Sequence, residues 1–159
     1  MDIQIIAVGK IKERYLNQGI NEYLKRLKSY AKVSIVEVKD EATDDQMTQA
    51  QIDQVLEKEA ERIHARLDSS RHLVVMAIEG DLISSEDLAK KLDHLAIYGK
   101  SKVTFLIGGS LGLAEQLKRQ ATWRISFGRI TLPHQLMRLV LVEQIYRSFR
   151  INAGHAYHK

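Results

Sequence analysis

The sequence contains no cysteine, and this absence narrows the chemistry that the chain can perform. Without thiols there can be no disulfide framework, no thiolate metal site and no cysteine nucleophile, which fits a reducing compartment. The six histidines include no H-x-x-x-H pair and no H-E-x-x-H motif, so the helical zinc spacing is also missing. We therefore predict that the chain has no structural metal.

Long hydrophobic runs are missing as well. The chain opens on Met1-Asp2-Ile3, with no basic segment ahead of an apolar stretch, and the longest aliphatic run near its end is Leu139 to Val142. We expect a soluble, cytoplasmic protein without a membrane partner. A length of 159 residues with 45% hydrophobic content predicts one domain, residues 1–159, that buries roughly two-thirds of its unfolded surface.

Acidic residues are scarce in the last third of the chain. From Gln116 to Lys159 there are eight Lys or Arg residues and one carboxylate, Glu143, although the whole chain carries a net charge of only +4. A clustered basic field favours a polyanion such as RNA, because phosphates attract grouped cations more strongly than dispersed ones. The alternative is a solvated basic helix that serves only solubility.

Apolar runs alternate with segments of helical period, which predicts an α/β fold with a mostly parallel sheet flanked by helices. Ser84-Ser85-Glu86-Asp87 should supply the N-cap hydroxyl and first-turn acids of a helix that stops near Gly99, and Pro133 should open another helix that runs toward Phe149. The polar segment 40–51 is expected to be a flexible connection. The expected strands are Ile3 to Val8, Val33 to Val38, Leu73 to Ile78, Val103 to Ile107 and Arg124 to Phe127.

Two glycine-containing segments follow expected strands and could line one pocket. Gly108 to Gly112 comes directly after a strand, where glycines allow positive φ and close approach to a ligand. The pattern is not G-x-G-x-x-G and no acid follows at the ribose-binding distance, so a nicotinamide site is disfavoured. Ser126 to His134 could grip a flat heterocycle through backbone groups. The alternative for the first segment is a tight turn without a ligand.

The C-terminal region carries two further features. The segment 135–150 is apolar almost all round, which predicts a helix that is either central in the monomer or shared with a partner, and we expect a symmetric homodimer. After it, Tyr157 could stack on a base and His158 could exchange a proton near neutral pH. A disordered tail is the alternative.

Five separated motifs together resemble the RlmH family of SPOUT-class enzymes, which methylate N3 of a pseudouridine in 23S ribosomal RNA. They span the chain in the order of the sequence: Ile5 to Lys10, Leu106 to Leu113, Leu132 to Arg138, Glu143 to Arg147 and Ala156 to Lys159. The stretch 152–155 departs from the family pattern.

The resemblance implies a fold, a cofactor and a substrate. The fold would be the SPOUT α/β knot, with a C-terminal trefoil, and the cofactor would be S-adenosylmethionine. The enzyme would be a homodimer in which the partner's tail completes the active site, with Tyr157 and His158 as catalytic candidates. Its substrate would be 23S rRNA within the assembled ribosome, contacted by Arg129, Arg138 and Lys159. The residues that would hold the cofactor are Met76, Gly108, Phe127, Gly128, Arg129, Ile130, Thr131 and Leu132.

Two other functions remain open on the sequence. A non-enzymatic ribosome- or RNA-binding factor would use the same basic face without a cofactor, and a small-molecule enzyme would use a different nucleotide. Cofactor binding separates these possibilities, since only the methyltransferase requires affinity for S-adenosylmethionine.

Overall fold

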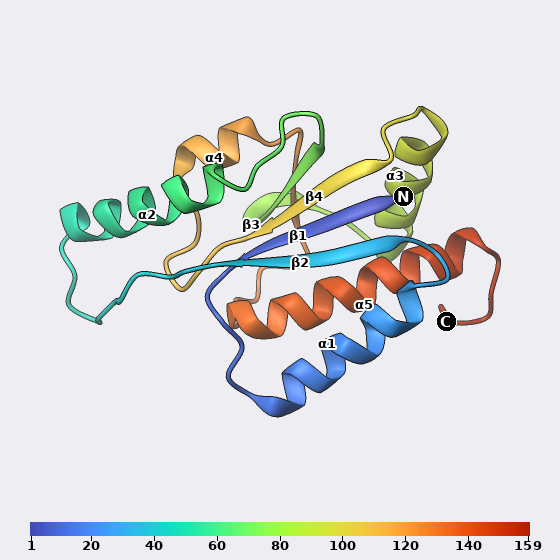
Figure 1. The fold of residues 1–159 in the computed structure, drawn as a ribbon, viewed down its shortest axis with the longest axis horizontal. Helices are drawn as coiled ribbons and strands as arrows, with labels where there is room; N and C mark the ends of the chain where they lie inside the picture. The colour runs from blue at the N-terminus through green and yellow to red at the C-terminus, as the bar shows by residue number, and fades with distance from the viewer.

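A computed structural model describes residues 1–159 as one five-stranded parallel sheet with helices on both faces (Figure 1). The strand order is β2-β1-β4-β3-β5. The α/β class, the five strands and their parallel direction are therefore confirmed, whereas the knot stays a prediction. The strands are β1 (Asp2–Val8), β2 (Lys32–Val38), β3 (His72–Leu82), β4 (Lys102–Ile107) and β5 (Trp123–Ser126), and the helices are α1 (Arg14–Leu27), α2 (Gln49–His64), α3 (Ser85–Ile97), α4 (Glu115–Gln120) and α5 (His134–Asn152).

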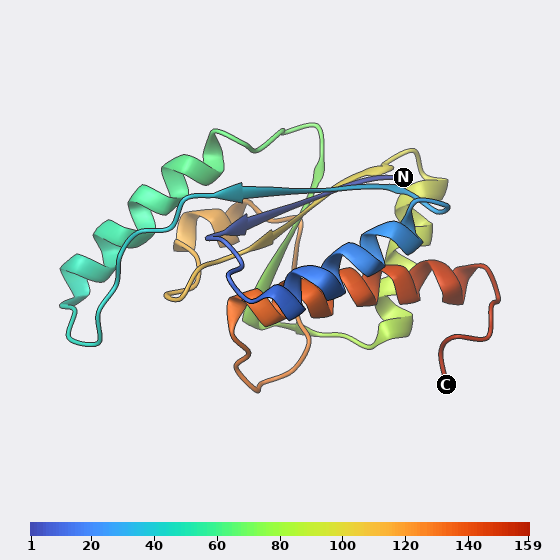
Figure 2. The same cartoon turned by 60° about the horizontal axis from the view of Figure 1, so that its bottom comes forward.

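Alternate side chains of the central strands build two separate cores. Ile3, Ile5 and Ala7 of β1 pack with α1, α3 and α5 on one face, whereas Ile6 and Val8 pack with α2 and α4 on the other. Successive side chains of a strand point to opposite faces, so a central parallel strand must be apolar on both. Figure 2 shows α1 and α5 together below the sheet, with α2 on the opposite side.

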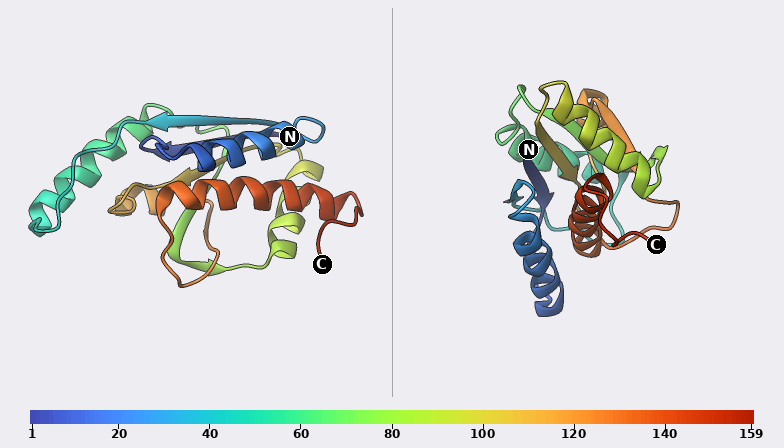
Figure 3. Two further views of the ribbon diagram at one scale, coloured as in Figure 1. Left: turned by 90° about the horizontal axis from the view of Figure 1, so that it is seen from below. Right: turned by 90° about the vertical axis from the view of Figure 1, so that its right-hand side faces the viewer.

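Helix α5 lies at the centre of one core and runs alongside α1 (Figure 3). Leu141, Val142 and Ile145 are completely buried, and Leu139 comes close to Gly19 of α1, where an added Cβ would lie 3.0 Å away. This helix is therefore central within the single chain, which was one of the two possibilities raised by its apolar surface. It is not long and apolar enough to cross a membrane, and neither is any other helix.

The local signals for helix ends are mostly confirmed. Ser84 caps α3 in a reciprocal pair with Asp87, and Gly99, with a φ of 74°, follows the helix end. Helix α5 begins at His134, one residue after Pro133, which is its N-cap. The expected connection 40–51 is shorter than predicted, because α2 already begins at Gln49 behind a Thr48 capping box.

Strand β3 extends beyond the predicted end at Ile78 and reaches Leu82. Its pairing with β5 is irregular between Met76 and Asp81, so the strand bends where it passes the end of the sheet. Gly80 lies in the bend, where a Cβ atom would be 2.8 Å from the backbone of Arg124. No hydrophobic alternation marks such a bend, which explains why the prediction stopped early.

Candidate active site

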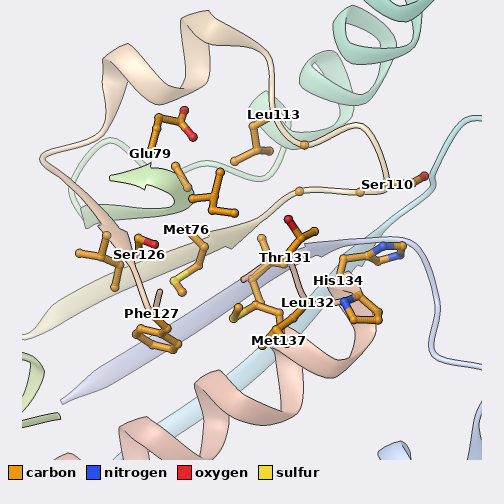
Figure 4. Close-up of a pocket in the computed structure, with 18 of the residues that line it drawn as sticks. Met76, Glu79, Ser110, Leu113, Ser126, Phe127, Thr131, Leu132, His134 and Met137 are labelled. Atoms are coloured by element: carbon orange, nitrogen blue, oxygen red, sulfur yellow. The ribbon is translucent and has the colours of Figure 1, made fainter. Parts of the chain in front are cut away.

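A pocket of about 660 Å³ opens at the carboxyl ends of β3, β4 and β5, beside the first turn of α5 (Figure 4). This is the edge at which open parallel α/β sheets bind their ligands. Its walls combine backbone from two glycine-containing loops with apolar side chains, and its volume suits a nucleoside-sized molecule. The apolar part of the lining includes Met76, Ile125, Phe127, Leu132 and Met137.

The first loop, residues 108–113, is shaped by glycine for two different reasons. Gly112 has a φ of 82°, and its N–H donates to the carbonyl of Gly109 at 3.0 Å. At Gly108 the reason is space, because a Cβ would lie 2.5 Å from the carbonyl oxygen of Gly112. The expected positive φ therefore occurs at Gly112, whereas Gly108 permits the close return of the backbone.

A buried carboxylate supports this loop from the side opposite the pocket. Glu59 of α2 is only 4% exposed and accepts the N–H of Glu41 at 2.9 Å. A Cβ at Gly109 would lie 3.4 Å from its carboxylate and 3.0 Å from Val8. Burial raises the pKa of Glu59 above its ordinary value, an effect that the Glu41 N–H opposes. The first loop thus lies close to Val8 and Glu59 at Gly109, while Ser110 and Gly112 are exposed to solvent.

The second loop, residues 127–133, is held by a short turn at Ser126. The Ser126 hydroxyl donates to the carbonyl of Gly128 at 2.7 Å and accepts its N–H at 3.2 Å. Gly128 has a φ of 144°, a backbone conformation that residues with a side chain rarely adopt. Ile130, 82% exposed, lies at the tip of the loop. The loop therefore presents backbone groups to the pocket while its base is fixed.

Seven of the eight predicted cofactor residues line this one pocket, and Arg129 is the exception. The Arg129 side chain lies on the outside of the loop, where it donates to the carbonyls of Ile78 and Gly80. It joins the second loop to the bent end of β3. Because the side chain is exposed, it also remains accessible to a partner at the pocket rim.

Several lining residues were not singled out from the sequence. Glu79 and Lys118 form an ion pair of 2.7 Å at the wall, and this hydrogen bond lowers the pKa of the Glu79 carboxyl. Met137 lines the opposite side from α5. Glu79 directly follows the predicted strand that ends at Ile78. Because the carboxyl ends of parallel strands meet at one edge of the sheet, this position could have indicated that Glu79 lies near the pocket.

His134 lies in the second predicted segment and lines the pocket from the start of α5. Burial is the main reason that its pKa falls below the ordinary value, and the Arg138 guanidinium lowers it further, against the opposing effect of Asp40. The imidazole is therefore neutral at neutral pH, and it adds no positive charge to the pocket.

Arg138 occupies a different environment from the one expected of an RNA contact. The residue is 3% exposed, donates to Glu37 at 2.6 Å and donates to the carbonyl of Gly9 at 3.1 Å. Its guanidinium is thus engaged inside the protein and does not face solvent. The expectation that Arg138 contacts RNA phosphates is wrong for this conformation. The sequence shows that the residue is basic, but not that its side chain points inward, toward the ends of β1 and β2.

The predicted catalytic residues of the tail lie apart from the pocket of the same chain. Tyr157 donates to Glu143 at 3.0 Å and packs edge-on against Tyr146. His158 contacts Arg147 through Nδ1 at 3.2 Å and Glu86 through Nε2 at 2.7 Å. Neither residue is among those lining the pocket. The views agree that the C-terminus and the first loop are at opposite ends (Figures 1 and 2).

These contacts engage the polar atoms of both tail residues. Burial, followed by its hydrogen bonds, raises the pKa of the Tyr157 phenol well above its ordinary value, so the phenol stays protonated near neutral pH. An arginine always donates, so Nδ1 of His158 accepts from Arg147 and Nε2–H donates to Glu86. In this arrangement Nδ1 of His158 therefore faces Arg147 and Nε2 faces Glu86.

Comparison with known proteins decides the family. A family model described as "Predicted SPOUT methyltransferase" matches residues 1–158. The chain belongs to the SPOUT methyltransferase family. It is 60% identical over 159 residues to Ribosomal RNA large subunit methyltransferase H of Listeria monocytogenes and 54% identical to the protein of that name from Enterococcus faecalis, covering 100% of both chains in each case. The resemblance drawn from the five motifs is confirmed.

Solved structures share the fold of this SPOUT chain at low sequence identity. A putative methylase family protein from Neisseria gonorrhoeae superposes with a TM-score of 0.56 at 13% identity, covering 99% of this chain and 86% of that one. The tRNA (m1G37) methyltransferase from Aquifex aeolicus gives 0.54 at 13% identity, covering 92% and 70%. At this identity the likeness concerns the fold, and it agrees with the sheet described above.

Proposed function

We propose that this chain transfers a methyl group from S-adenosylmethionine to N3 of a pseudouridine in 23S ribosomal RNA. The observation that carries the proposal is the single pocket that gathers both glycine-containing loops at the carboxyl edge of a SPOUT sheet. Full-length relatives at 54–60% identity, named as ribosomal RNA methyltransferases, support the substrate class. The choice of N3 and of pseudouridine rests on the resemblance to the RlmH family.

The residues of the pocket fit a nucleoside with an attached amino-acid chain. Backbone N–H and C=O groups of residues 108–113 and 127–133 can bind a base and ribose, while Met76, Phe127 and Leu132 cover apolar surface. The bound cofactor supplies an activated methyl group on its sulfonium sulfur. The structure contains no group of three His, Asp or Glu side chains able to hold a metal ion.

The protein's own residues must align the acceptor base and help N3 lose its proton. Alignment of the reacting atoms is the larger contribution, because it removes the entropy cost of bringing two molecules together. His158 is a candidate base, and Tyr157 a candidate for orienting the acceptor. Both lie away from the pocket of their own chain, which supports a homodimer in which the tail of one subunit completes the pocket of the other.

The proposed substrate is the assembled ribosome in the cytoplasm. Residues 1–159 fold around a single five-stranded sheet, and we propose that the shape of the ribosome supplies part of the substrate recognition. Arg129, exposed beside the pocket, and Lys159, exposed in the tail, are proposed to contact phosphates. Arg138 is left out of this set because it is buried and paired with Glu37.

The proposal is tested by methyl transfer from labelled S-adenosylmethionine to intact ribosomes, separated subunits and naked ribosomal RNA. The modified nucleoside is then identified by mass. Methylated pseudouridine from assembled ribosomes is the expected result. Cofactor binding without transfer to any of the three acceptors would move the reaction to another substrate, and absence of cofactor binding would favour the non-enzymatic binding factor.

A further inference from the structure

Three exposed cations, called the loop cations below, lie on a fixed backbone: two in the loop between β1 and α1 and the third, Arg14, at the first residue of α1. Lys10, Lys12 and Arg14 are exposed, whereas Ile11 between them is 9% exposed and packs into the core. Asn17 of α1 donates to the carbonyl of Ile11 at 3.1 Å, which fixes the loop from its other side. Because Ile11 anchors the loop inward, its lysine neighbours extend toward solvent.

Two contacts place this loop next to the pocket. The N–H of Gly9 donates to the carbonyl of Val38 at 2.8 Å, and its carbonyl accepts from Arg138 at 3.1 Å. A Cβ at Gly9 would lie 3.6 Å from Nε2 of His134, which itself lines the pocket. Figures 1 and 2 likewise show the start of the loop beside the first turn of α5. Arg138 thus joins the loop to α5, the helix whose first residue, His134, lines the pocket.

The three loop cations form no ion pair within the chain, unlike their neighbours at the same edge of the sheet. Lys118 pairs with Glu79, Arg62 with Glu41 and Arg138 with Glu37, so these charges are largely neutralised. Glu13 is the one carboxylate in the loop itself, and Asp40 faces Gly9 from the end of β2. The loop therefore keeps a surplus of positive charge beside the pocket mouth.

We propose that Lys10, Lys12 and Arg14 bind the RNA phosphate backbone next to the nucleotide that enters the pocket. The inference rests on the proposed function for the nature of the polyanion, but its evidence is the charge and placement of the loop. Flexible, unpaired cations on a fixed loop suit phosphates, which reward each neutralised charge through release of counterions. This surface lies outside the basic last third of the chain, from which an RNA contact was expected.

The test compares two triple variants that remove the same charge. The loop variant is Lys10→Gln, Lys12→Gln and Arg14→Gln. The control is Lys32→Gln, Lys100→Gln and Lys102→Gln, three exposed and unpaired cations at the opposite, amino-terminal edge of the sheet. Binding of purified large ribosomal subunits and of naked 23S rRNA is measured by filter retention over a range of salt. Circular dichroism and S-adenosylmethionine affinity verify that both variants are folded.

The loop variant should bind both RNA samples at least tenfold more weakly and lower the slope of log K against log salt by about 0.7–0.9 for each phosphate that it no longer neutralises. The control should stay within about twofold, since a nonspecific change in charge is its only effect. Equal weakening in both variants, or an unchanged salt slope, would overturn the proposal. Weakened binding to subunits but not to naked RNA would also overturn it, because the loop would then contact a ribosomal protein.

Methyl transfer separates this inference from the proposed function. If the unmodified protein methylates ribosomes and the loop variant retains its KM, the phosphate contact is wrong while the enzyme assignment stands. If the unmodified protein binds RNA in a salt-dependent way but transfers no methyl group, the enzyme assignment fails and the binding comparison still decides the role of the loop. The single variants Lys10→Gln and Lys12→Gln repeat the comparison at exposed positions with little risk to folding.

Discussion

Gly108 allows the first loop to return on itself within the pocket wall. A Cβ at this position would lie 2.5 Å from the carbonyl oxygen of Gly112, and this backbone group cannot move aside as a side chain can. Glycine is favoured at position 99 for another reason: its φ is 74°, whereas a Cβ atom there would meet open space. Substitutions at Gly108 and Gly99 therefore distinguish the effect of filling space in the pocket wall from the effect of backbone strain.

We expect Gly108→Val to abolish measurable S-adenosylmethionine binding and to destabilise the fold by about 1–3 kcal/mol, the usual cost of overpacking. Gly99→Ala should cost roughly 1 kcal/mol through its positive φ, yet leave cofactor affinity unchanged. Isothermal titration with the cofactor and urea unfolding measure the two effects. Normal affinity in the Gly108 variant would show that the first loop does not line the binding site.

Two half-buried histidines predict how stability depends on pH. Burial lowers the pKa of His72 and of His134 below the ordinary value of 6.5. The unfolded chain therefore takes up protons at higher pH than the folded chain, so the stability present above pH 6.5 should decline as the pH falls toward the folded pKa values. Carboxylates whose pKa is lowered, such as Asp2, lose their contribution only at more acidic pH.

We expect the free energy of unfolding to fall as the pH drops below 6.5, and the variant His72→Gln/His134→Gln to show a smaller fall. Urea unfolding at several pH values measures both slopes. The exposed His94→Gln variant controls for the number of histidines and should retain the slope of the unmodified protein. A fall of equal size in the double variant would assign the pH dependence to other groups.

At the scale of elements, short runs of Ile and Val predicted the strands well because buried parallel strands must be apolar on both faces. Capping residues predicted the start of α3, since Ser84 and Asp87 act within one turn. The bend in β3 and the inward direction of Arg138 were not predictable in this way. Both depend on contacts across the fold, Gly80 with Arg124 and Arg138 with Glu37.

In the candidate site, too, features with a local sequence signal could be predicted, and contacts between distant segments could not. Six of the seven cofactor candidates that line the pocket lie in the two glycine-containing segments that the sequence singled out, whereas Met76 of β3 was named from the family resemblance. The Glu79–Lys118 pair joins residues 39 positions apart and has no local signal. The loop cations beside the pocket were missed for a related reason, because the first 115 residues are acidic on average and that average conceals three unpaired cations.

The C-terminal tail, residues 157–159, can be tested by deletion. Deleting residues 157–159 should leave cofactor affinity unchanged and reduce methyl transfer by about a hundredfold or more, as expected on losing a positioned proton acceptor. Glu86→Gln is the matched control, because it weakens the contact of His158 within its own chain while keeping the tail. Glu86 is 52% exposed at its side chain, so the control should be stable. Retained transfer after the deletion would refute a catalytic tail.

At the scale of the whole molecule, the pocket and the tail occupy different parts of one chain. Helix α5 connects them, with His134 and Met137 at the pocket and Glu143 and Arg147 holding the tail. If the tail completes the active site, as proposed, the site needs either a large rearrangement of the tail or a second chain. The rearrangement would break the contacts of Tyr157 and His158, whereas a second chain could bring its own tail to the pocket.

Mixed dimers distinguish these arrangements. A Gly108→Val chain keeps its tail but has a disabled pocket, and a chain lacking residues 157–159 keeps its pocket but has no tail. If the tail acts on the partner's pocket, each mixed dimer regains one site, and random assembly should restore about a quarter of normal activity, since half of the dimers are mixed. If each tail served its own pocket, the mixed dimers would stay inactive. Methyl transfer by the two coexpressed chains, compared with each chain alone, measures the difference.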